Sequence, residues 1–345
     1  MTFTQTFTAA ILCCLGLVYS IETSANSWRV NYDKRANADF LDLNAAMADD
    51  RVTDGDTLYV DKRSTISTEQ TITKSVTVIG PGYFIGENDA DEAYFSNTIK
   101  LDADGIKLTG LHTSTIQVRA NNAVIERCRV TGNIAADIKA YENDEGDVHS
   151  CFIEGHIVGN SDNGSSEDWK ITNNIFYDTQ YNGMCIEHFR NVVIDHNSFY
   201  KTGWQELLYN VKNSSFTNNI VMKTNTGYFF KDTALEDNNI YSHNVLTTNL
   251  GNNYPNNKQI ETNLSLVFSN PDALNIDKSY SLPDNSPARN YAEDGSDCGA
   301  FAGAFPYILN GYPLYVPRFE SITVPSQPSE DGMLRIQMVI KNQNK

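Results

Sequence analysis

The hydrophobic and polar positions of the chain repeat at a regular spacing. One pattern recurs six times: an apolar residue, two variable residues, Asn or Cys, one variable residue and another apolar residue. Successive copies are 22 to 25 residues apart, and a weaker copy starts at Leu108. The middle residues of the six copies are Cys128, Cys151, Asn174, Asn197, Asn219 and Asn244. A period of this length indicates a solenoid in which each repeat stacks on its neighbours.

The residue types within the repeats predict strands. The units contain many Val, Ile, Phe, Thr and Asn residues, and they lack the dense Leu pattern and helical segment of leucine-rich repeats. One coil of a parallel β-helix consists of three short strands joined by turns, and successive coils stack at about 4.8 Å. Equivalent apolar residues then form buried columns. We therefore predict an all-β protein, a right-handed parallel β-helix, over residues 26–310.

The Asn column has a physical reason of its own. A turn between two strands leaves backbone groups inside the coil, away from water, and an Asn amide can both donate to them and accept from them. Cys128 and Cys151 occupy the same column in adjacent coils. We interpret them as small buried residues that extend the ladder, although their placement would also permit a disulfide.

The N-terminal part of the predicted domain contains a helix and the first strands. Phe40, Leu43 and Met47 lie three and four residues apart, which predicts an amphipathic helix that covers the first coil. Residues 56–60 and 75–79 read as strands, and Gly80-Pro81-Gly82 ends the second one.

The C-terminal part loses the repeat from about Asn249 onward. Residues 319–324 and 333–340 look like two strands around a turn at residues 329–332. We predict a C-terminal β-hairpin extension over residues 311–345, packed on or beyond the last coil.

The first 25 residues read as an export signal. Residues 9–19 form an apolar stretch that is too short to span a membrane, and small residues follow before Asn26. The segment before this stretch carries no Lys or Arg, which is atypical of such signals. No other segment is apolar enough to span a bilayer. We expect a secreted protein, either extracellular, periplasmic or at the cell surface.

The net charge and the spacing of the cysteines indicate which partners and metal ions the protein could bind. The net charge of −17 argues against nucleic acid, since a polyanion would be repelled. Clustered carboxylates suit calcium, which is the one cofactor that the composition suggests. The cysteines show no C-x-x-C spacing, so no zinc site is expected. We expect a monomer.

Several segments resemble the bacterial pectate-lyase-like β-helix proteins. Residues 55–60 and 75–84 resemble the first coils of many members, and residues 191–197 resemble a middle coil. Residues 286–288, which lead to residues 297–301, resemble the end of the helix. Together these segments extend over most of residues 26–310.

The resemblance implies the fold more than the chemistry. Polysaccharide lyases, glycoside hydrolases, esterases, tailspikes and adhesins share this fold. The Arg-x-Pro-x-x-Arg segment of the best-known pectate lyases is missing, as is the Asn-Thr-Asp-Gly segment of polygalacturonases. Ile194-Asp195-His196 is similar to a Trp-Ile-Asp-His element of pectate lyases, but Val193 stands in place of the Trp, and the general coil pattern explains it equally well.

Two sets of polar residues could form a site on one long face. Counting four residues from each Asn gives Asp178, Lys201 and Lys223, which we expect to stack in one outward column. Counting twelve to fourteen residues gives a second column. Its members are Glu187 and His188, then Tyr209 and Asn210, then Lys231 and Asp232, with Arg190 and Lys212 just beyond.

A uronate lyase needs a cation to neutralise the substrate carboxylate and a base to take the neighbouring proton. The predicted catalytic residues are Lys201, Lys223, His188 and Arg190. The predicted substrate-binding residues are Asp178, Tyr181, Glu187, Trp204, Tyr209, Lys212 and Tyr228.

Other activities stay open. Hydrolysis would need a carboxylate pair, for which Asp178 and Glu187 are the nearest candidates. Outward charged columns could also be no more than a solvated surface. The predicted function is therefore binding of or action on an acidic polysaccharide, as a polysaccharide lyase or as a noncatalytic glycan-binding β-helix.

Overall fold

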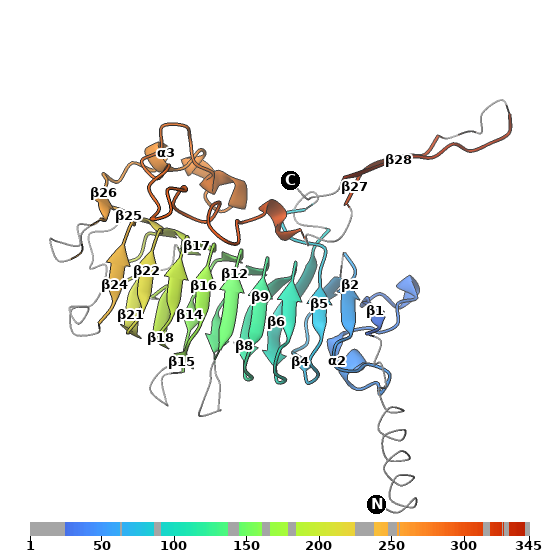
Figure 1. Cartoon of the computed structure of the whole chain (residues 1–345). Helices are drawn as coiled ribbons and strands as arrows, with labels where there is room; N and C mark the ends of the chain where they lie inside the picture. Colours follow the sequence, from blue (N-terminus) through green and yellow to red (C-terminus); the bar gives the residue numbers. More distant parts are fainter. Residues whose placement is uncertain are drawn as a thin grey trace, which may run out of the picture.

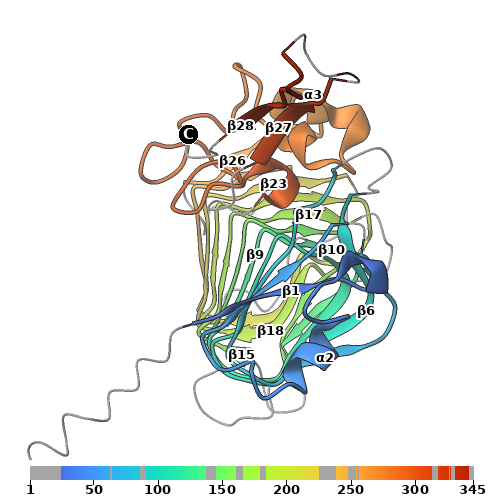
Figure 2. The same cartoon turned by 90° about the vertical axis from the view of Figure 1, so that its right-hand side faces the viewer.

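The chain coils into a stack of parallel strands, which confirms the predicted all-β architecture (Figure 1). The computed structural model describes residues 25–62, 64–85, 91–136, 145–160, 166–178, 184–224, 238–247, 254, 256–312, 318–325, 327 and 331–341. The proposed signal peptide, except for its last residue, lies outside them. Every strand pair of the two large sheets is parallel, and successive coils superimpose when viewed along the stack, as in a parallel β-helix (Figure 2).

Sheet A takes one strand from each coil. Its described strands, in spatial order, are β1 (Ser27–Val30), β2 (Thr57–Val60), β5 (Thr77–Ile79), β7 (Lys107–Thr109), β9 (Ala123–Glu126), β12 (Gly146–His149), β16 (Lys170–Thr172), β19 (Val193–Asp195), β22 (Ser215–Thr217) and β24 (Ile240–Ser242).

Sheet B bends around the rest of each coil and has two faces. The long strands β6 (Ala93–Leu101) and β8 (His112–Val118) run through both of them, and β3 (Ser64–Ile66) and β4 (Gln70–Ile72) pair with β6. Face one contains β10 (Arg129–Val130), β13 (Phe152–Ile153), β17 (Ile175–Asp178), β20 (Ser198–Lys201), β23 (Ile220–Lys223), β25 (Val245–Leu246) and β26 (Lys258–Gln259). Face two contains β11 (Ile134–Ala136), β14 (Ile157–Val158), β15 (Ser166–Glu167), β18 (Ile186–Arg190) and β21 (Leu208–Lys212).

The apolar residues of the repeat fill the interior, as the pattern predicts. In sheet A they stack in register from coil to coil and are all buried. This column consists of Ile125, Val148, Ile171, Ile194, Phe216 and Tyr241. The buried column is one of the apolar contacts that hold the coils together, because each coil alone could not bury its own hydrophobic residues.

The predicted Asn ladder is present at the turn from sheet A to sheet B. The backbone N–H of Asn174 donates to Asn197 Oδ1 (2.9 Å), and that of Asn197 donates to Asn219 Oδ1 (2.8 Å). The Asn197 amide nitrogen also donates to the Ile171 carbonyl (2.8 Å). Asn257 extends the ladder by one coil, since its Oδ1 accepts from the Asn244 N–H (3.1 Å). Each amide thus satisfies buried backbone groups of its own and of the neighbouring coils.

Cys128 and Cys151 extend the ladder at its other end. Both thiols are free and fully buried, and the Cys128 N–H donates to the sulfur of Cys151 (3.4 Å). Of the two alternatives left open by the sequence, the structure therefore has small buried residues in place of a disulfide.

The residue before each ladder position has a left-handed backbone, which makes the tight corner. Its φ lies between 49° and 57° at Arg127, Ser150, Asn173, His196 and Asn218. Such values are uncommon for residues other than glycine, and Asn and His are among the side chains that tolerate them best.

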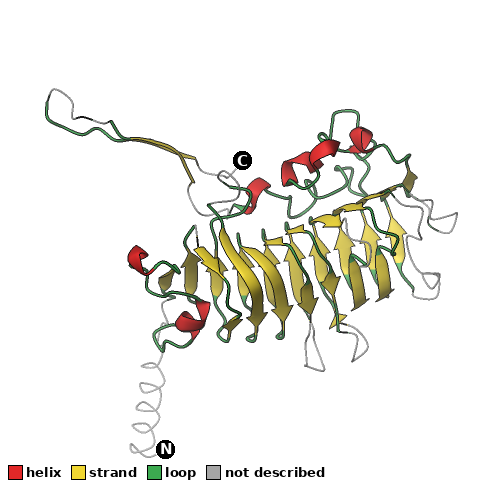
Figure 3. Cartoon of the chain, turned by 180° about the vertical axis from the view of Figure 1, so that it is seen from behind, coloured by secondary structure: helices red, strands yellow, loops and turns green. Residues whose placement is uncertain are grey.

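The C-terminal segment reverses direction after the last coil. Residues 264–312 include α3 (Leu264–Val267) and lie along face one, back toward the first coils (Figures 1 and 3). Ala300 N–H donates to Ser198 Oγ (3.0 Å), and Tyr83 N–H donates to the Asn310 carbonyl (2.8 Å). Phe268 and Tyr280 pack in a second core on the outer side of face one. Face one is therefore covered.

The ends of the chain carry the remaining elements. Helix α2 (Leu43–Met47) lies against β4, and its Leu43 N–H donates to Gln70 Oε1 (2.9 Å). Phe40 precedes the helix and forms a β-bridge with Val30. The predicted C-terminal hairpin is present as the antiparallel strands β27 (Arg318–Thr323) and β28 (Gln337–Lys341). It projects away from the body at the end of the stack near β1 and β2, so the prediction that it packs on or beyond the last coil was wrong (Figure 1). No helix within the described ranges is long and apolar enough to cross a membrane.

Candidate functional site

The column Asp178, Lys201 and Lys223 forms in the predicted register but points the opposite way. Asp178 pairs with Lys201, and Lys201 with Lys223, on adjacent strands of face one. All three are buried, at 1%, 0% and 2% exposure, so the expectation of an outward column was wrong. The reason is the alternation of strand side chains: Phe176 and Phe199 point into the core, and the residues two positions later must follow them.

The buried column is held by charge pairing. Lys201 Nζ forms an ion pair with Asp178 Oδ2. His156 Nε2 and Cys185 Sγ each lie 3.9 Å from the same carboxylate oxygen. Burial, with a further contribution from Lys201, lowers the pKa of Lys223. Because these side chains face the interior, Lys201 and Lys223 support the coil instead of contacting a polymer along its surface.

On face two, β18 and β21 bring the second predicted column together. Glu187 is in register with Tyr209, and Arg190 with Lys212, as the spacing predicts. Lys231 and Asp232 lie outside the described residues. We call the six residues Glu187, His188, Arg190, Tyr209, Asn210 and Lys212 the bulge face.

A β-bulge in each strand builds this face. In β18, Ile186 and Phe189 are both buried in the core, so two residues, Glu187 and His188, lie between two inward positions where regular alternation allows one. His188 has a φ of 64°, in the left-handed region. Asn210 repeats this conformation one coil later, with a φ of 50°. Gly159 of the preceding coil makes room, since a Cβ there would lie 2.0 Å from the His188 carbonyl oxygen.

The contact of His188 with Asn210 defines its tautomer. Its Nδ1 lies 3.0 Å from the amide nitrogen of Asn210. An amide nitrogen only donates, so Nδ1 accepts and the neutral ring carries its proton on Nε2. That nitrogen lies 3.7 Å from Glu187 Oε2, and the ring meets Tyr209 edge-on with centroids 5.5 Å apart. The bulge face therefore offers an N–H donor, a carboxylate and a phenol within a few ångströms of one another.

Two basic side chains flank these groups. Arg190 is partly exposed and pairs loosely with Glu167, whose Oε1 lies 3.6 Å from Nη1. Lys212 occupies the equivalent position one coil later and is half-buried. Trp204 lies in the turn between β20 and β21 and is 60% exposed. Tyr181 and Tyr228 lie outside the described residues.

His156 is a site residue that the sequence reasoning missed. It lies just before β14, beside the buried carboxylate of Asp178 and at the edge of face two. Burial lowers its pKa, and Lys201 lowers it further, against the opposite effects of Asp178 and Glu187. The imidazole is thus held neutral and can accept a proton. Counting one residue beyond the Asp178 column in the preceding coil would have found it.

The Asp195–His196 pair is structural. His196 is 4% exposed, and a Cβ on Gly303 would lie 2.8 Å from its ring. Its Nδ1 lies 2.6 Å from Asp195 Oδ2. Burial alone would raise the pKa of Asp195, but hydrogen bonds from His196, Thr217 and Asn218 lower it overall. The covering segment thus closes off this pair.

The part of the chain that the structure describes has no evident metal-binding centre. No group of three or more His, Cys, Asp and Glu side chains is placed there to hold an ion. Calcium binding stays a prediction from composition.

We compared the chain with protein-family models and with curated proteins. No protein-family model matches the chain, and a search of curated proteins finds no significant match.

Proposed function

We propose that this protein is a secreted polysaccharide lyase that binds an acidic glycan along the bulge face and cleaves it by β-elimination. The observation that carries the proposal is the double bulge at His188 and Asn210. Left-handed backbone also makes the ladder corners, but at His188 and Asn210 it lies inside a strand, where it is unfavourable, and such strain concentrates at functional sites. We further propose a right-handed coil of the pectate-lyase-like kind, with α2 as its N-terminal cap. Crossover connections between parallel strands are almost always right-handed, which supports the right-handed coil.

The accessible surface of the coil supports the choice of face. Residues 264–312 cover face one, so a polymer cannot lie along it. Glu187, His188, Tyr209 and Asn210 of face two are partly exposed side by side. A glycan chain needs such a row, because several consecutive sugar units must contact the protein.

Groups on and beside the bulge face match the requirements of uronate elimination. Arg190 and Lys212 supply positive charge for substrate carboxylates, which acidifies the neighbouring C–H proton. His156, held neutral, and Tyr209 are the candidates to accept that proton. His188 presents its Nε2–H as the donor for the leaving oxygen or for the developing enolate. Asn210 fixes the His188 tautomer by donating to Nδ1.

Hydrolysis fits the geometry less well. Asp178, one of the two carboxylates that hydrolysis would use, is buried and bound by Lys201. It cannot face Glu187 across a substrate, and an inverting or retaining hydrolase needs two accessible carboxyl groups.

The test is the ultraviolet absorbance of unsaturated products when the purified protein meets a panel of acidic polysaccharides, with and without calcium. We expect a rise on at least one glycan, and a loss of roughly 10²- to 10⁴-fold in kcat for His188→Ala, as for loss of an acid–base group. Lys223→Met is the matched control, because Lys223 faces the interior. Its kcat should stay within a few-fold.

The noncatalytic alternative has its own signature. If no glycan yields unsaturated products or new reducing ends, the lyase proposal fails for that panel. Binding that Arg190→Ala and Lys212→Ala weaken would then identify a glycan-binding β-helix.

A further inference from the structure

The C-terminal hairpin carries a concentrated group of exposed apolar side chains. Strands β27 and β28 project away from the stack (Figures 1 and 3), and we call residues 318–325 and 333–341 the hairpin arm. Large apolar side chains of this arm are 37% to 56% exposed, and they are those of Val324, Leu334, Ile336, Met338, Val339 and Ile340. A two-stranded hairpin is at best marginally stable by itself, and exposed apolar patches mark interaction surfaces. The hairpin arm therefore has the character of a docking element.

The register of the hairpin arm separates an apolar face from a polar one. Residues directly opposite on antiparallel strands share a face of the ribbon. Phe319 is opposite Ile340, and Ile322 is opposite Met338, so these register positions form an apolar face. A register shift between Phe319 and Ser321 keeps this set in phase along the ribbon. The other face takes the pairs Arg318 and Lys341, Ser321 and Val339, and Thr323 and Gln337.

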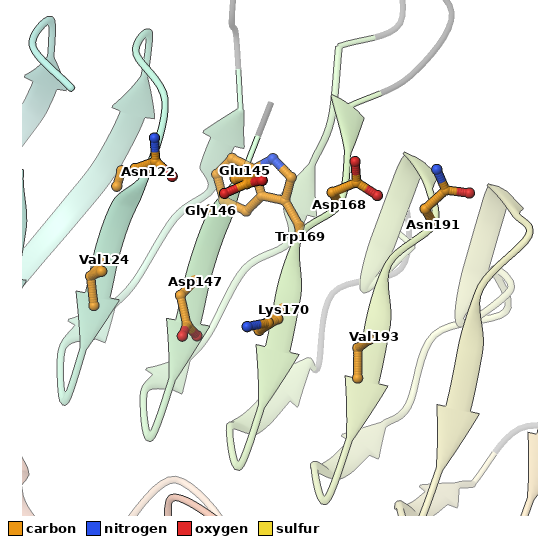
Figure 4. A pocket seen from close by; sticks show the side chains of 11 residues that line it. Asn122, Val124, Glu145, Gly146, Asp147, Asp168, Trp169, Lys170, Asn191 and Val193 are labelled. Carbon is orange, nitrogen blue, oxygen red and sulfur yellow. The ribbon is translucent and has the colours of Figure 1, made fainter. Parts of the chain in front are cut away.

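The outer side of sheet A offers no matching apolar surface. A hollow lies there across β9, β12, β16 and β19, and its row of register partners reads Val124, Asp147, Lys170 and Val193 (Figure 4). Charged groups thus separate the two valines, and single apolar residues are ordinary for a protein surface. The apolar face of the hairpin arm is better matched by the same face of a second copy.

Charge favours a two-fold pairing in which the two arms run in opposite directions. The base of the arm carries the register pair Arg318 and Lys341, and the segment that joins its strands carries Glu330 and Asp331. Opposed arms place the cations of one base beside the carboxylates of the other copy's far end.

The same arrangement keeps the two acidic bodies apart. The chain has a net charge of −17, so two bodies side by side would repel each other. Residues 333–341, extended at about 3.4 Å each, give an arm about 30 Å long. This length exceeds the Debye length of roughly 8 Å at physiological salt, so two bodies at opposite ends of the joined arms repel each other weakly.

The size of the apolar face sets the strength of the pairing. A ribbon about 30 Å long and about 10 Å wide, covered on one side in each copy, removes on the order of 1,000 Å² of accessible surface. Specific interfaces start at roughly 1,200 Å², so we expect a reversible dimer at micromolar concentration.

We propose that this protein forms a reversible two-fold dimer through the apolar faces of its hairpin arms. Two ribbons would stack face to face at about 10 Å, with Met338 and Ile340 of each copy in the contact. This proposal departs from the expectation of a monomer. It does not rest on the lyase activity proposed for the bulge face.

The experiment is sedimentation velocity of the purified protein at concentrations from about 1 µM to about 300 µM. We expect a monomer at the lowest concentration, a dimer at the highest, and a Kd on the order of 10 µM. Met338→Asp puts a charge into the contact and should weaken the dimer at least about tenfold. Val339→Asp is the matched control, because it adds the same charge on the polar face, and its Kd should stay within about twofold of the wild type. Circular dichroism should show an unchanged coil in both variants.

Three outcomes would overturn the proposal. A single species at every concentration would exclude the dimer. Equal weakening by Met338→Asp and Val339→Asp, or a dimer that survives Met338→Asp combined with Ile340→Asp, would place the contact on another surface. Flotation with phosphatidylglycerol vesicles, of a protein that stays monomeric in solution, would assign the hairpin arm to a lipid surface instead.

Discussion

Two polar columns of sheet B occupy the same coils but face opposite ways. Asp178 and Lys201 end β17 and β20 and point into the interior, whereas Glu187 and Tyr209 belong to β18 and β21 of the bulge face and point outward. Residue type does not distinguish the two columns, because both combine a carboxylate with groups that could act in catalysis. Their direction is set by the backbone, through regular alternation in the first column and through a bulge in the second.

The two columns also differ in how much their ion pairs contribute to the stability of the fold. A buried ion pair loses its hydration, and its attraction only offsets that cost when both partners are present. An exposed pair such as Arg190 and Glu167 is screened by water and contributes little. The buried column is therefore sensitive to the loss of one partner, and the bulge face is tolerant of it.

The largest effect should come from breaking the buried pair. Asp178→Ala leaves the fully buried Lys201 ammonium without its carboxylate, and we expect a loss of about 3–5 kcal/mol in the free energy of unfolding. Urea denaturation followed by circular dichroism measures it. Arg190→Ala on the bulge face is the matched comparison and should change stability by no more than about 0.5 kcal/mol.

A second variant shows whether stability is lost because a buried charge has no partner or because side-chain volume is missing. Replacing Asp178 by Leu and Lys201 by Met together removes both charges and keeps the apolar volume, so much of the stability should return. Equal losses in Asp178→Ala and Arg190→Ala would mean that the column is not the sensitive element that its burial implies.

The direction of the Asp178 column shows where sequence reasoning ends. The spacing from the Asn ladder predicted the column and its register correctly, because each coil adds the same number of residues between Asn174 and Asp178 as between Asn197 and Lys201. The inward direction followed from the same spacing, since Phe176 lies two residues before Asp178. Charged residue type led us to expect solvent there, and the buried pairing with Lys201 is a tertiary effect.

Two other features could not be predicted from the repeat. The bulge at His188 depends on a left-handed backbone at a non-glycine residue, which no local pattern signals. The return of residues 264–312 along face one depends on apolar residues without periodicity, such as Phe268 and Tyr280. The apolar columns and the Asn ladder were predictable, because they repeat in every coil.

A smaller effect should appear as pH dependence of the buried column. The folded protein has a pKa for Lys223 below the ordinary 10.5, because burial disfavours the charged form. The unfolded chain therefore holds the proton over a pH range in which the folded chain has released it, and stability from this residue rises as pH approaches 10.5. At lower pH both states are protonated, and the burial of the charge is a constant cost.

The measurement compares wild type with Lys223→Met in urea denaturation between pH 7 and about pH 10. The wild type should gain stability relative to the variant as pH rises, because other titrating groups cancel in the difference. A flat difference for Lys223→Met would indicate that its ammonium group reaches water.

A small effect on stability should come with a large effect on function at His188. His188→Gly removes a side chain from a left-handed backbone position, and relief of that strain should offset the lost contacts with Asn210 and Tyr209, so the free energy of unfolding should change by no more than about 1 kcal/mol. Activity should fall as in His188→Ala.

Asn210→Gly repeats the relief of strain one coil later and removes only the group that holds the His188 tautomer, so it should retain part of the activity. If His188→Gly instead destabilises the protein by several kcal/mol, the bulge would be maintained by the His188 contacts themselves, and the argument that the strain serves function would fail. The pair of glycine variants therefore separates a bulge that presents catalytic groups from one that only turns the chain.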